Sequence, residues 1–173
     1  MTRDGEGAAR YVLDANVFIE AARRYYTFEL CPGFWDCLIS LHDTGHFGSV
    51  DRVKAELRRG KDHLAHWAAN AVQTTFFAST EGPEVVSCFA GLMQWVHRNA
   101  QFLDEAKAEF ASAADGWLVA YAKVYGLTVV THEEYAQDVR RRVKIPNLCR
   151  AFDVPYTDTF RMLTELKVTF SWS

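Results

Sequence analysis

The sequence predicts an α/β protein in which a central parallel sheet is flanked by helices. Two short apolar runs, Tyr11-Val12-Leu13 and Leu127-Thr128-Val129-Val130, lack the alternation of a half-exposed strand and are typical of strands buried on both faces. Stretches with helical apolar spacing fill most of the chain between them. Strands that alternate with helices form parallel sheets, because each crossover helix packs back onto the sheet.

In the first third of the chain, apolar spacing and helix-breaking residues mark the boundaries of the elements. The apolar positions after the first strand recur at helical spacing, and Cys31-Pro32-Gly33 interrupts the chain before the next helical pattern. Gly45 and Gly60 are typical helix ends. We therefore expect strands over residues 11–13 and 46–50, and helices over 15–26, from Phe34 to Leu41, and over 51–57.

The second part of the chain is predicted to be mainly helical. Leu92, Trp95 and Val96 form an apolar stripe, and Gly126 ends a helix that begins at Asp115. We expect helices over residues 61–72, 83–99, 101–110, 115–125 and 157–166, a strand over 127–130, and an apolar segment from Ile145 to Val154. With 173 residues and no linker, residues 1–173 are predicted to form a single domain that carries a helical insertion over about 61–111.

Composition excludes several classes of protein. Apolar residues make up 49% and charged residues 24%, which is the balance of a globular protein rather than of a disordered chain or a coiled coil. The net charge of -3 argues against binding nucleic acid through a strong overall positive field, so such a partner needs a local site.

The sequence also predicts a cytoplasmic protein without a membrane segment. The first ten residues, MTRDGEGAAR, lack the apolar core of a signal peptide, and no run approaches the roughly 18 apolar residues of a membrane helix. The four cysteines form no C-x-x-C pair, which makes a zinc site or a redox motif improbable. We expect four reduced, mostly buried thiols.

Ligands of open α/β sheets bind beyond the carboxyl ends of the strands, and Asp14 closes the first strand. Asp14 could instead cap the helix that follows it, since Asp is a favoured capping residue. Asp115 has the same two interpretations. If the helix includes Asp115, however, its carboxylate shares a face with Leu118, Val119 and Ala122, and a carboxylate on a buried face is costly unless another group pairs with it.

Two further acids lie in comparable positions. Glu56 borders the apolar face that Val53 and Leu57 define, and surface ion pairs of about 0–1 kcal/mol would not justify an inward glutamate. Glu133 follows the strand over 127–130 by two residues, although it could also be a solvated loop acid beside Glu134.

Four carboxylates brought together would repel one another. At about 4 Å and an effective dielectric constant of about 20, each pair costs about 4 kcal/mol. A divalent cation removes this repulsion, and oxygen ligands without cysteine or evident histidine indicate Mg²⁺ or Mn²⁺ rather than zinc.

At these residues the sequence resembles the PIN-domain family of metal-dependent ribonucleases, which includes the VapC toxins of bacterial toxin–antitoxin pairs. The resemblance extends from about Tyr11 to Leu166. Within the family, the sequence is most similar to a larger, uncharacterised PIN-like subgroup. The family resemblance is carried by Tyr-Val-Leu-Asp14-Ala-Asn16-Val-Phe-Ile, Val53-Lys-Ala-Glu56-Leu, Ala114-Asp115-Gly-Trp-Leu-Val-Ala-Tyr-Ala and Val-Val-Thr131-His-Glu133. The likeness to the subgroup is carried by Tyr25-Tyr26 and by the Cys31-Pro-Gly-Phe-Trp35 and Lys144-Ile-Pro-Asn147 segments. The fourth acid of the family is often Asp, whereas here it is Glu133, or Thr131 takes over its role.

The resemblance implies a PIN-like α/β/α sandwich that hydrolyses RNA phosphodiester bonds with Mg²⁺ or Mn²⁺. Asp14, Glu56 and Asp115 would hold the metal, and Glu133 would be the fourth catalytic acid. The supporting residues would be Asn16 and Thr131, and the residues in a position to contact RNA are Arg140, Arg141, Arg142 and Lys144. The implied partners are an RNA substrate, a cognate antitoxin and a second copy of the chain in a homodimer.

Other interpretations stay open from the sequence. The chain could be a degenerate PIN-like module that binds RNA or protein without cleaving it. A phosphatase built on Asp14 is less well supported, because the second Asp of such a site is Asn16 here. The basic run could be a solvated loop. His63 and His66 lack a third ligand and are expected on a helix surface.

Overall fold

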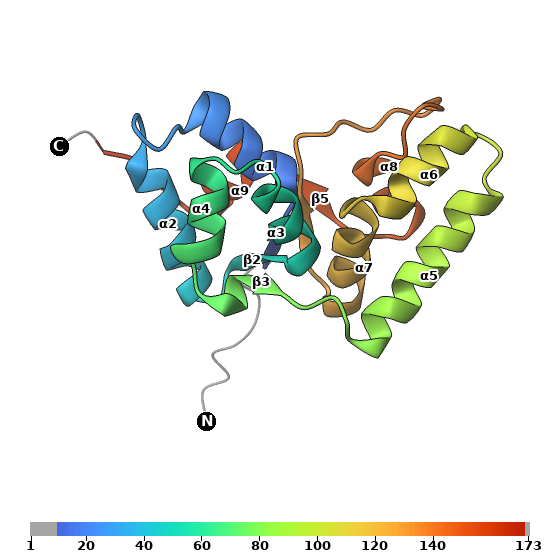
Figure 1. The fold of residues 1–173 in the computed structure, drawn as a ribbon, viewed down its shortest axis with the longest axis horizontal. Helices are drawn as coiled ribbons and strands as arrows, with labels where there is room; N and C mark the ends of the chain where they lie inside the picture. Colours follow the sequence, from blue (N-terminus) through green and yellow to red (C-terminus); the bar gives the residue numbers. More distant parts are fainter. Residues whose placement is uncertain (1–9, 172–173) are drawn as a thin grey trace.

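The computed structural model describes residues 10–171 and contains a five-stranded parallel sheet (Figure 1). The strand order is β3-β2-β1-β4-β5. The strands are β1 (Tyr11–Leu13), β2 (Phe47–Val50), β3 (Phe77–Ala78), β4 (Thr128–Val130) and β5 (Tyr156–Thr157). The segment considered for a signal peptide, residues 1–9, lies outside the described residues.

The three strands expected from the sequence are confirmed, and they form the centre of the sheet. Strand β1 pairs with β2 on one side and with β4 on the other, and Leu13 stands opposite Val130. All three residues of β1 are buried, as expected for an apolar strand with neighbours on both edges and helices around it.

The structure corrects the prediction at the two edges of the sheet. The outer strands β3 and β5 contain two residues each and were not predicted, because so short a segment carries no periodicity. Strand β3 also shows that residues 61–111 are not a purely helical insertion, since this stretch supplies one edge of the sheet.

Helices make up most of the described chain, close to the predicted ranges except at Ile145–Ala151, which was predicted only as part of an apolar segment and is a helix. They are α1 (Ala15–Glu20), α2 (Pro32–Asp43), α3 (Asp51–Arg58), α4 (His63–Asn70), α5 (Pro83–Arg98), α6 (Asp104–Ser112), α7 (Asp115–Tyr125), α8 (Ile145–Ala151) and α9 (Thr159–Glu165). A π-helical turn, Ala21–Tyr25, continues α1, and a short 3₁₀ turn, Thr74–Phe76, precedes β3. No helix within residues 10–171 is long and apolar enough to cross a bilayer.

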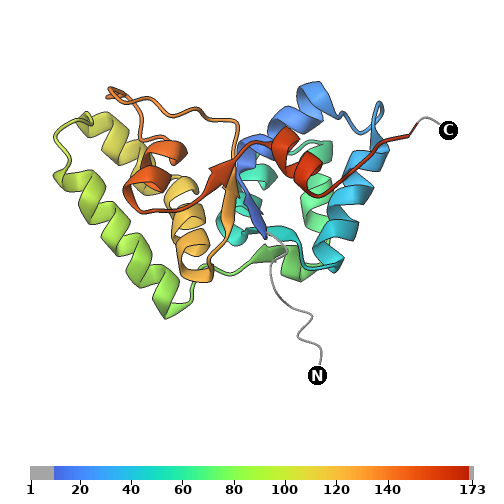
Figure 2. The ribbon, with the colours of Figure 1, turned by 180° about the vertical axis from the view of Figure 1, so that it is seen from behind.

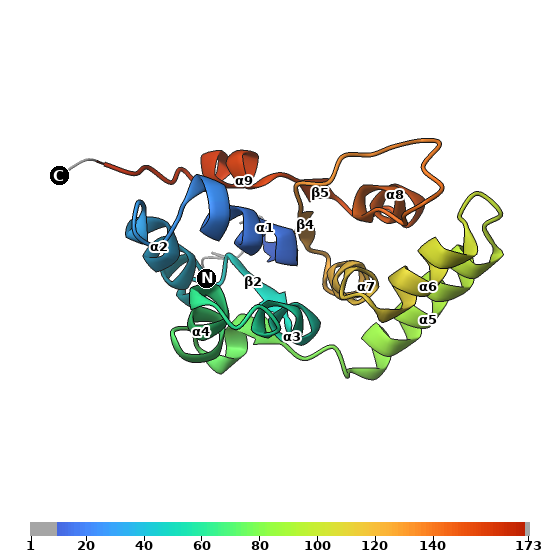
Figure 3. The same cartoon turned by 45° about the horizontal axis from the view of Figure 1, so that its top comes forward.

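The helices cover the sheet and extend it on one side. Helix α7 packs against β1, β2 and β4, while α2 and α3 pack against β2. Helix α5 lies along α7 and, together with α6, projects away from the sheet, as Figures 1 and 3 show. Figure 2 shows α8, β5 and α9 from behind, on the side opposite α3 and α4.

Two glycines offer a direct test of the backbone conformation. Gly126 ends α7 in the left-handed region, with φ of 66°, and leads directly into the segment that forms β4. Gly91 lies in the exposed interior of α5, where a Cβ would meet nothing within 4 Å. We expect Gly126→Ala to lower the free energy of unfolding by about 1 kcal/mol, and Gly91→Ala to raise it by about 0.5–1 kcal/mol. Urea unfolding measures both, and destabilisation by Gly91→Ala would contradict the helical assignment.

Candidate active site

Asp14 lies at the carboxyl end of β1 and is buried, with 1% of its surface exposed. Its backbone N–H donates to the carbonyl of Val130, as the pairing of β1 with β4 requires. Asp14 occupies the N-cap position of α1, but its side chain makes no capping hydrogen bond. Its Oδ2 instead accepts a hydrogen bond of 3.1 Å from the Oγ1 of Thr131. The capping interpretation of this side chain is therefore wrong.

Asp115 and Glu56 face one small pocket. Asp115 is the first residue of α7, where Ala114 is the N-cap, and its side chain makes no capping bond either. The pocket has a volume of about 110 Å³, and its lining includes Asn16, Glu56, Asp115 and Arg142. Residues from four separate segments thus meet where the sequence analysis expected a site.

Glu133 is fixed by three contacts beyond the end of β4. Its backbone N–H donates to Thr131 Oγ1 at 3.1 Å, and its Oε2 accepts from the backbone N–H of Ile145 at 2.8 Å. Its Oε1 forms an ion pair of 2.8 Å with Arg142. Within the described residues, however, no hydrogen bond of good geometry reaches this buried oxygen. Glu133 is therefore not the solvated loop acid that was the alternative, since its side chain is only 9% exposed.

Thr131 connects the two acids that follow the strands. Its hydroxyl donates to Asp14 and accepts from the N–H of Glu133, so a single side chain orients both segments. The sequence left open whether Thr131 or Glu133 completes the site. In the structure both residues lie there, with Thr131 as the support of Asp14.

The electrostatic environment indicates that the acids act on one another. Burial, followed by the charges of Asp115 and Glu133, raises the pKa of Asp14 well above its usual range, and the Thr131 hydrogen bond opposes this shift. Burial, with Glu133 and Glu56, raises the pKa of Asp115 to about 7, and Arg142 opposes this shift. These four carboxylates therefore form one interacting cluster, which is called the acidic cluster below (Asp14, Glu56, Asp115 and Glu133).

The basic run divides between the pocket and the surface. Arg142 lines the pocket and pairs with Glu133. Arg140 donates to the carbonyl of Gln101 and Lys144 to the carbonyl of Glu134, while Arg141 is exposed. Of the four residues expected near RNA, the structure brings Arg142 into contact with the acidic cluster.

The sequence analysis missed several residues around this pocket. Glu109 of α6 lines it beside Asp115 and contributes to the raised pKa of that residue. A neighbouring groove of about 270 Å³ shares Glu56 and Ala113 with the pocket and includes Arg52 and Arg59. The sequence signal for Glu109 was its place directly before the apolar Phe110, which is buried. The sequence does not show, however, which way α6 runs relative to the pocket.

The donors suit a hard divalent cation. All four acids offer carboxylate oxygens, which are the ligands that hard divalent cations take in proteins. Among residues 10–171, however, no three Asp, Glu, His or Cys side chains are gathered closely enough to form a metal-binding group.

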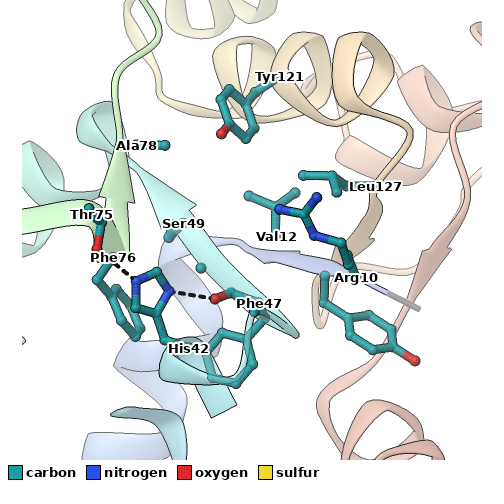
Figure 4. Close-up of a pocket in the computed structure, with 13 residues that line it drawn as sticks. Arg10, Val12, His42, Phe47, Ser49, Thr75, Phe76, Ala78, Tyr121 and Leu127 are labelled. Atoms are coloured by element: carbon teal, nitrogen blue, oxygen red, sulfur yellow. Dashed lines mark hydrogen bonds between the residues drawn. The ribbon is translucent and has the colours of Figure 1, made fainter. Parts of the chain in front are cut away.

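A second pocket lies at the opposite end of the strands and contains no comparable chemistry (Figure 4). Its His42 bonds the Phe47 carbonyl at 2.7 Å and Thr75 Oγ1 at 3.0 Å, which uses both ring nitrogens. Gly48 lies so close to the next strand that a Cβ would stand 2.9 Å from the Phe76 carbonyl oxygen. His42 therefore acts as a structural link between α2, β2 and the segment before β3.

Comparison with known proteins agrees with the fold. A family model described as a domain of unknown function (DUF4411) matches residues 11–170. No curated protein sequence matches the chain. A chain in the crystal structure of VapBC2 from Rickettsia felis, bound to a DNA fragment from their promoter, superposes with a TM-score of 0.53 at 13% identity. The match covers 86% of this chain and 97% of that chain, and it shows the PIN-like α/β fold.

The raised pKa of Asp115 predicts how stability depends on pH. Unfolded aspartates lose their protons near pH 4, whereas folded Asp115 keeps its proton to about pH 7. The folded state therefore binds more protons over this range, and the stability of the metal-free protein falls as pH rises from about 4 to about 7.

Asp115→Asn should remove much of this dependence. We expect the variant to be more stable than the natural chain by about 4 kcal/mol near pH 8 and equal to it near pH 4, since each pKa unit between about 4 and about 7 corresponds to about 1.4 kcal/mol. Asp36→Asn, at an exposed position on α2, is the matched control and should change neither value. Urea unfolding in a chelator at both pH values measures the effect, and equal stability of the Asp115 variant throughout would contradict the cluster.

Proposed function

The chain belongs to the DUF4411 family, and we propose that it is a divalent-metal-dependent endoribonuclease of the PIN type, the toxin of a toxin–antitoxin pair. One observation carries the proposal. The acidic cluster, which the Asp14, Glu56, Asp115 and Glu133 motifs predict, interacts at the carboxyl ends of β1 and β4 beside a pocket with a basic border. This is the location where α/β sheets bind ligands.

Asp14, Glu56 and Asp115 would hold Mg²⁺ or Mn²⁺, and the ion would lower the pKa of a water molecule and stabilise charge on the phosphate. Thr131 keeps Asp14 in place through its hydrogen bond. Asn16 lines the same pocket and offers an amide to a ligand or to a water molecule. Arg142 lines the same pocket and its side chain is half-exposed, so donors of its guanidinium that Glu133 does not use could bind a phosphodiester.

The groove beside the cluster supplies a route for the RNA backbone. Arg59 lines it and is exposed at the end of α3. Arg52 lies over the ring of Trp117, with its guanidinium 4.5 Å from the ring centre, and its Nε donates to Thr80. We propose that Arg59 binds phosphate and that Arg52 contributes charge from a fixed position.

The proposed partner is an antitoxin, by likeness to the VapBC2 structure from Rickettsia felis. A homodimer is proposed on the same resemblance. A module that binds RNA without cleaving it is the second candidate, because no three acids among the described residues are gathered into a metal-binding group. The two candidates differ in whether Mg²⁺ or Mn²⁺ supports hydrolysis.

The first test concerns metal and cleavage. With Mn²⁺, the purified chain should cleave members of a panel of single-stranded and structured RNAs, and Asp14→Asn should lower the rate by roughly 10³-fold or more through loss of a metal ligand. Calorimetry should show weaker Mn²⁺ binding in the Asp14, Glu56 and Asp115 amide variants. Asp36→Asn should retain both properties.

Intact RNA throughout the panel, with RNA still bound, would support the non-cleaving module instead. Unchanged Mn²⁺ affinity in all three amide variants would argue against a shared metal site even if cleavage were seen.

The second test concerns the basic groove. Arg59→Ala should weaken RNA binding to a similar extent for different RNA sequences. It should also reduce the slope of log affinity against log salt concentration by about 1, since one phosphate contact is lost. Lys123→Ala is the control, because Lys123 lies near the end of α7 that is remote from Asp115. Binding is measured by fluorescence anisotropy over a salt series, and an unchanged slope for Arg59→Ala would remove this residue from the RNA path.

A further inference from the structure

A larger hollow lies on the other side of Glu133 from the acidic pocket. Its volume is about 460 Å³, against about 110 Å³ for the pocket that contains Asp115. Thr131 and Glu133 line it, and these are the residues that support the acidic cluster. The ion pair between Glu133 and Arg142 therefore stands between the two hollows.

Aromatic side chains gather on one wall of this hollow. His132 and Phe160 line it, with ring centroids 6.0 Å apart. Tyr25 contacts both, at 5.4 Å from Phe160 and 6.0 Å from His132. Phe160 and Tyr25 are each 47% exposed. Their exposed surfaces are thus available to a ligand.

The other wall carries an aromatic ring and a cation. The guanidinium of Arg150 lies 3.7 Å from the ring centre of Tyr135, and its Nε donates to the hydroxyl of Tyr156. Tyr135 is 38% exposed. A planar guanidinium fixed on an aromatic ring presents a flat surface for stacking, which is how proteins often hold unpaired bases.

Polar groups in the hollow can form hydrogen bonds with the edge of a base. Glu134 and Asp158 line it and can accept hydrogen bonds from exocyclic amino groups, while Arg161 of the same lining can donate to carbonyl oxygens or ring nitrogens. Thr157 lines the hollow as well, but its Oγ1 is buried beneath the surface and bonds no described residue.

We propose that this hollow binds an unpaired nucleobase of single-stranded RNA, next to the phosphodiester at the acidic cluster. The inference rests on the proposed ribonuclease function and adds a specificity site to it. Phe160 and the stacked pair of Tyr135 and Arg150 supply the base contacts. RNA that is recognised in this way must be single-stranded at the site, because a paired base cannot enter the hollow.

The experiment measures binding separately from cleavage. A short, fluorescein-labelled, single-stranded RNA of mixed sequence is titrated, with Mn²⁺ in large excess, into the Asp14→Asn protein, which holds the RNA uncut while Glu56 and Asp115 remain to bind the ion. Adding Phe160→Ala or Tyr135→Ala should weaken binding about tenfold, whereas Phe160→Tyr, which keeps the ring, should retain it. Tyr125→Ala is the matched control, since Tyr125 is 53% exposed at the end of α7 that is remote from Asp115.

Wild-type affinity in both alanine variants, or no RNA binding by the parent protein, would overturn the base site. An antitoxin segment as the true occupant would give the first of these outcomes. Cleavage by the natural chain is assayed in parallel with Mn²⁺. If the natural chain cleaves RNA but Phe160→Ala leaves RNA binding unchanged, the base site is wrong and the nuclease function stands. If Phe160→Ala weakens RNA binding but the natural chain never cleaves RNA, the nuclease function is wrong and the base site stands.

Discussion

The pairing of β1 with β4 positions every other part of the site. Because Leu13 stands opposite Val130, Asp14 and Thr131 emerge side by side at the carboxyl ends of the two strands, and a hydrogen bond joins them. A shift of one residue in this register would turn the two side chains to opposite faces of the sheet. The position of Glu133 then depends on Thr131, because the hydroxyl of Thr131 accepts a hydrogen bond from the backbone N–H of Glu133. The local order of the site therefore follows from one pair of strands.

This arrangement carries an electrostatic cost that the rest of the molecule only partly offsets. Asp14 is buried and interacts with three other acids. Among the described residues that line the pocket, Arg142 is the one cation. Arg142 opposes the shift at Asp115, yet the pKa of that residue is still raised to about 7. Selection for stability alone would replace such carboxylates with amides or apolar groups. Their presence is thus better explained by a ligand that compensates their charge.

The sequence was informative where a physical signal is local. Apolar runs without alternation identify β1 and β4, and the glycine after Tyr125 identifies the end of α7. The acids at strand ends and on apolar helix faces could be identified as site candidates, because burying an unpaired carboxylate costs free energy. Strand β5 was missed because its two residues belong to the sheet only through pairing with β4. Arg142 could not be separated from its basic neighbours, because the path of an irregular segment decides which of them turns inward.

The positions of the charged residues matter more for RNA binding than the net charge of the chain. An overall charge of -3 excludes attraction of RNA by a general positive field, but it does not set the field near one phosphate. Here the acids are concentrated in a buried cluster whose negative charge a divalent cation would largely neutralise, while Arg59 and Arg142 lie on its border. Binding would then depend on the metal, since without it the cluster repels the same phosphates that the arginines attract. If the proposed function holds, RNA affinity in an acidic protein with this arrangement would depend on metal occupancy, which would not be so for a uniformly basic surface.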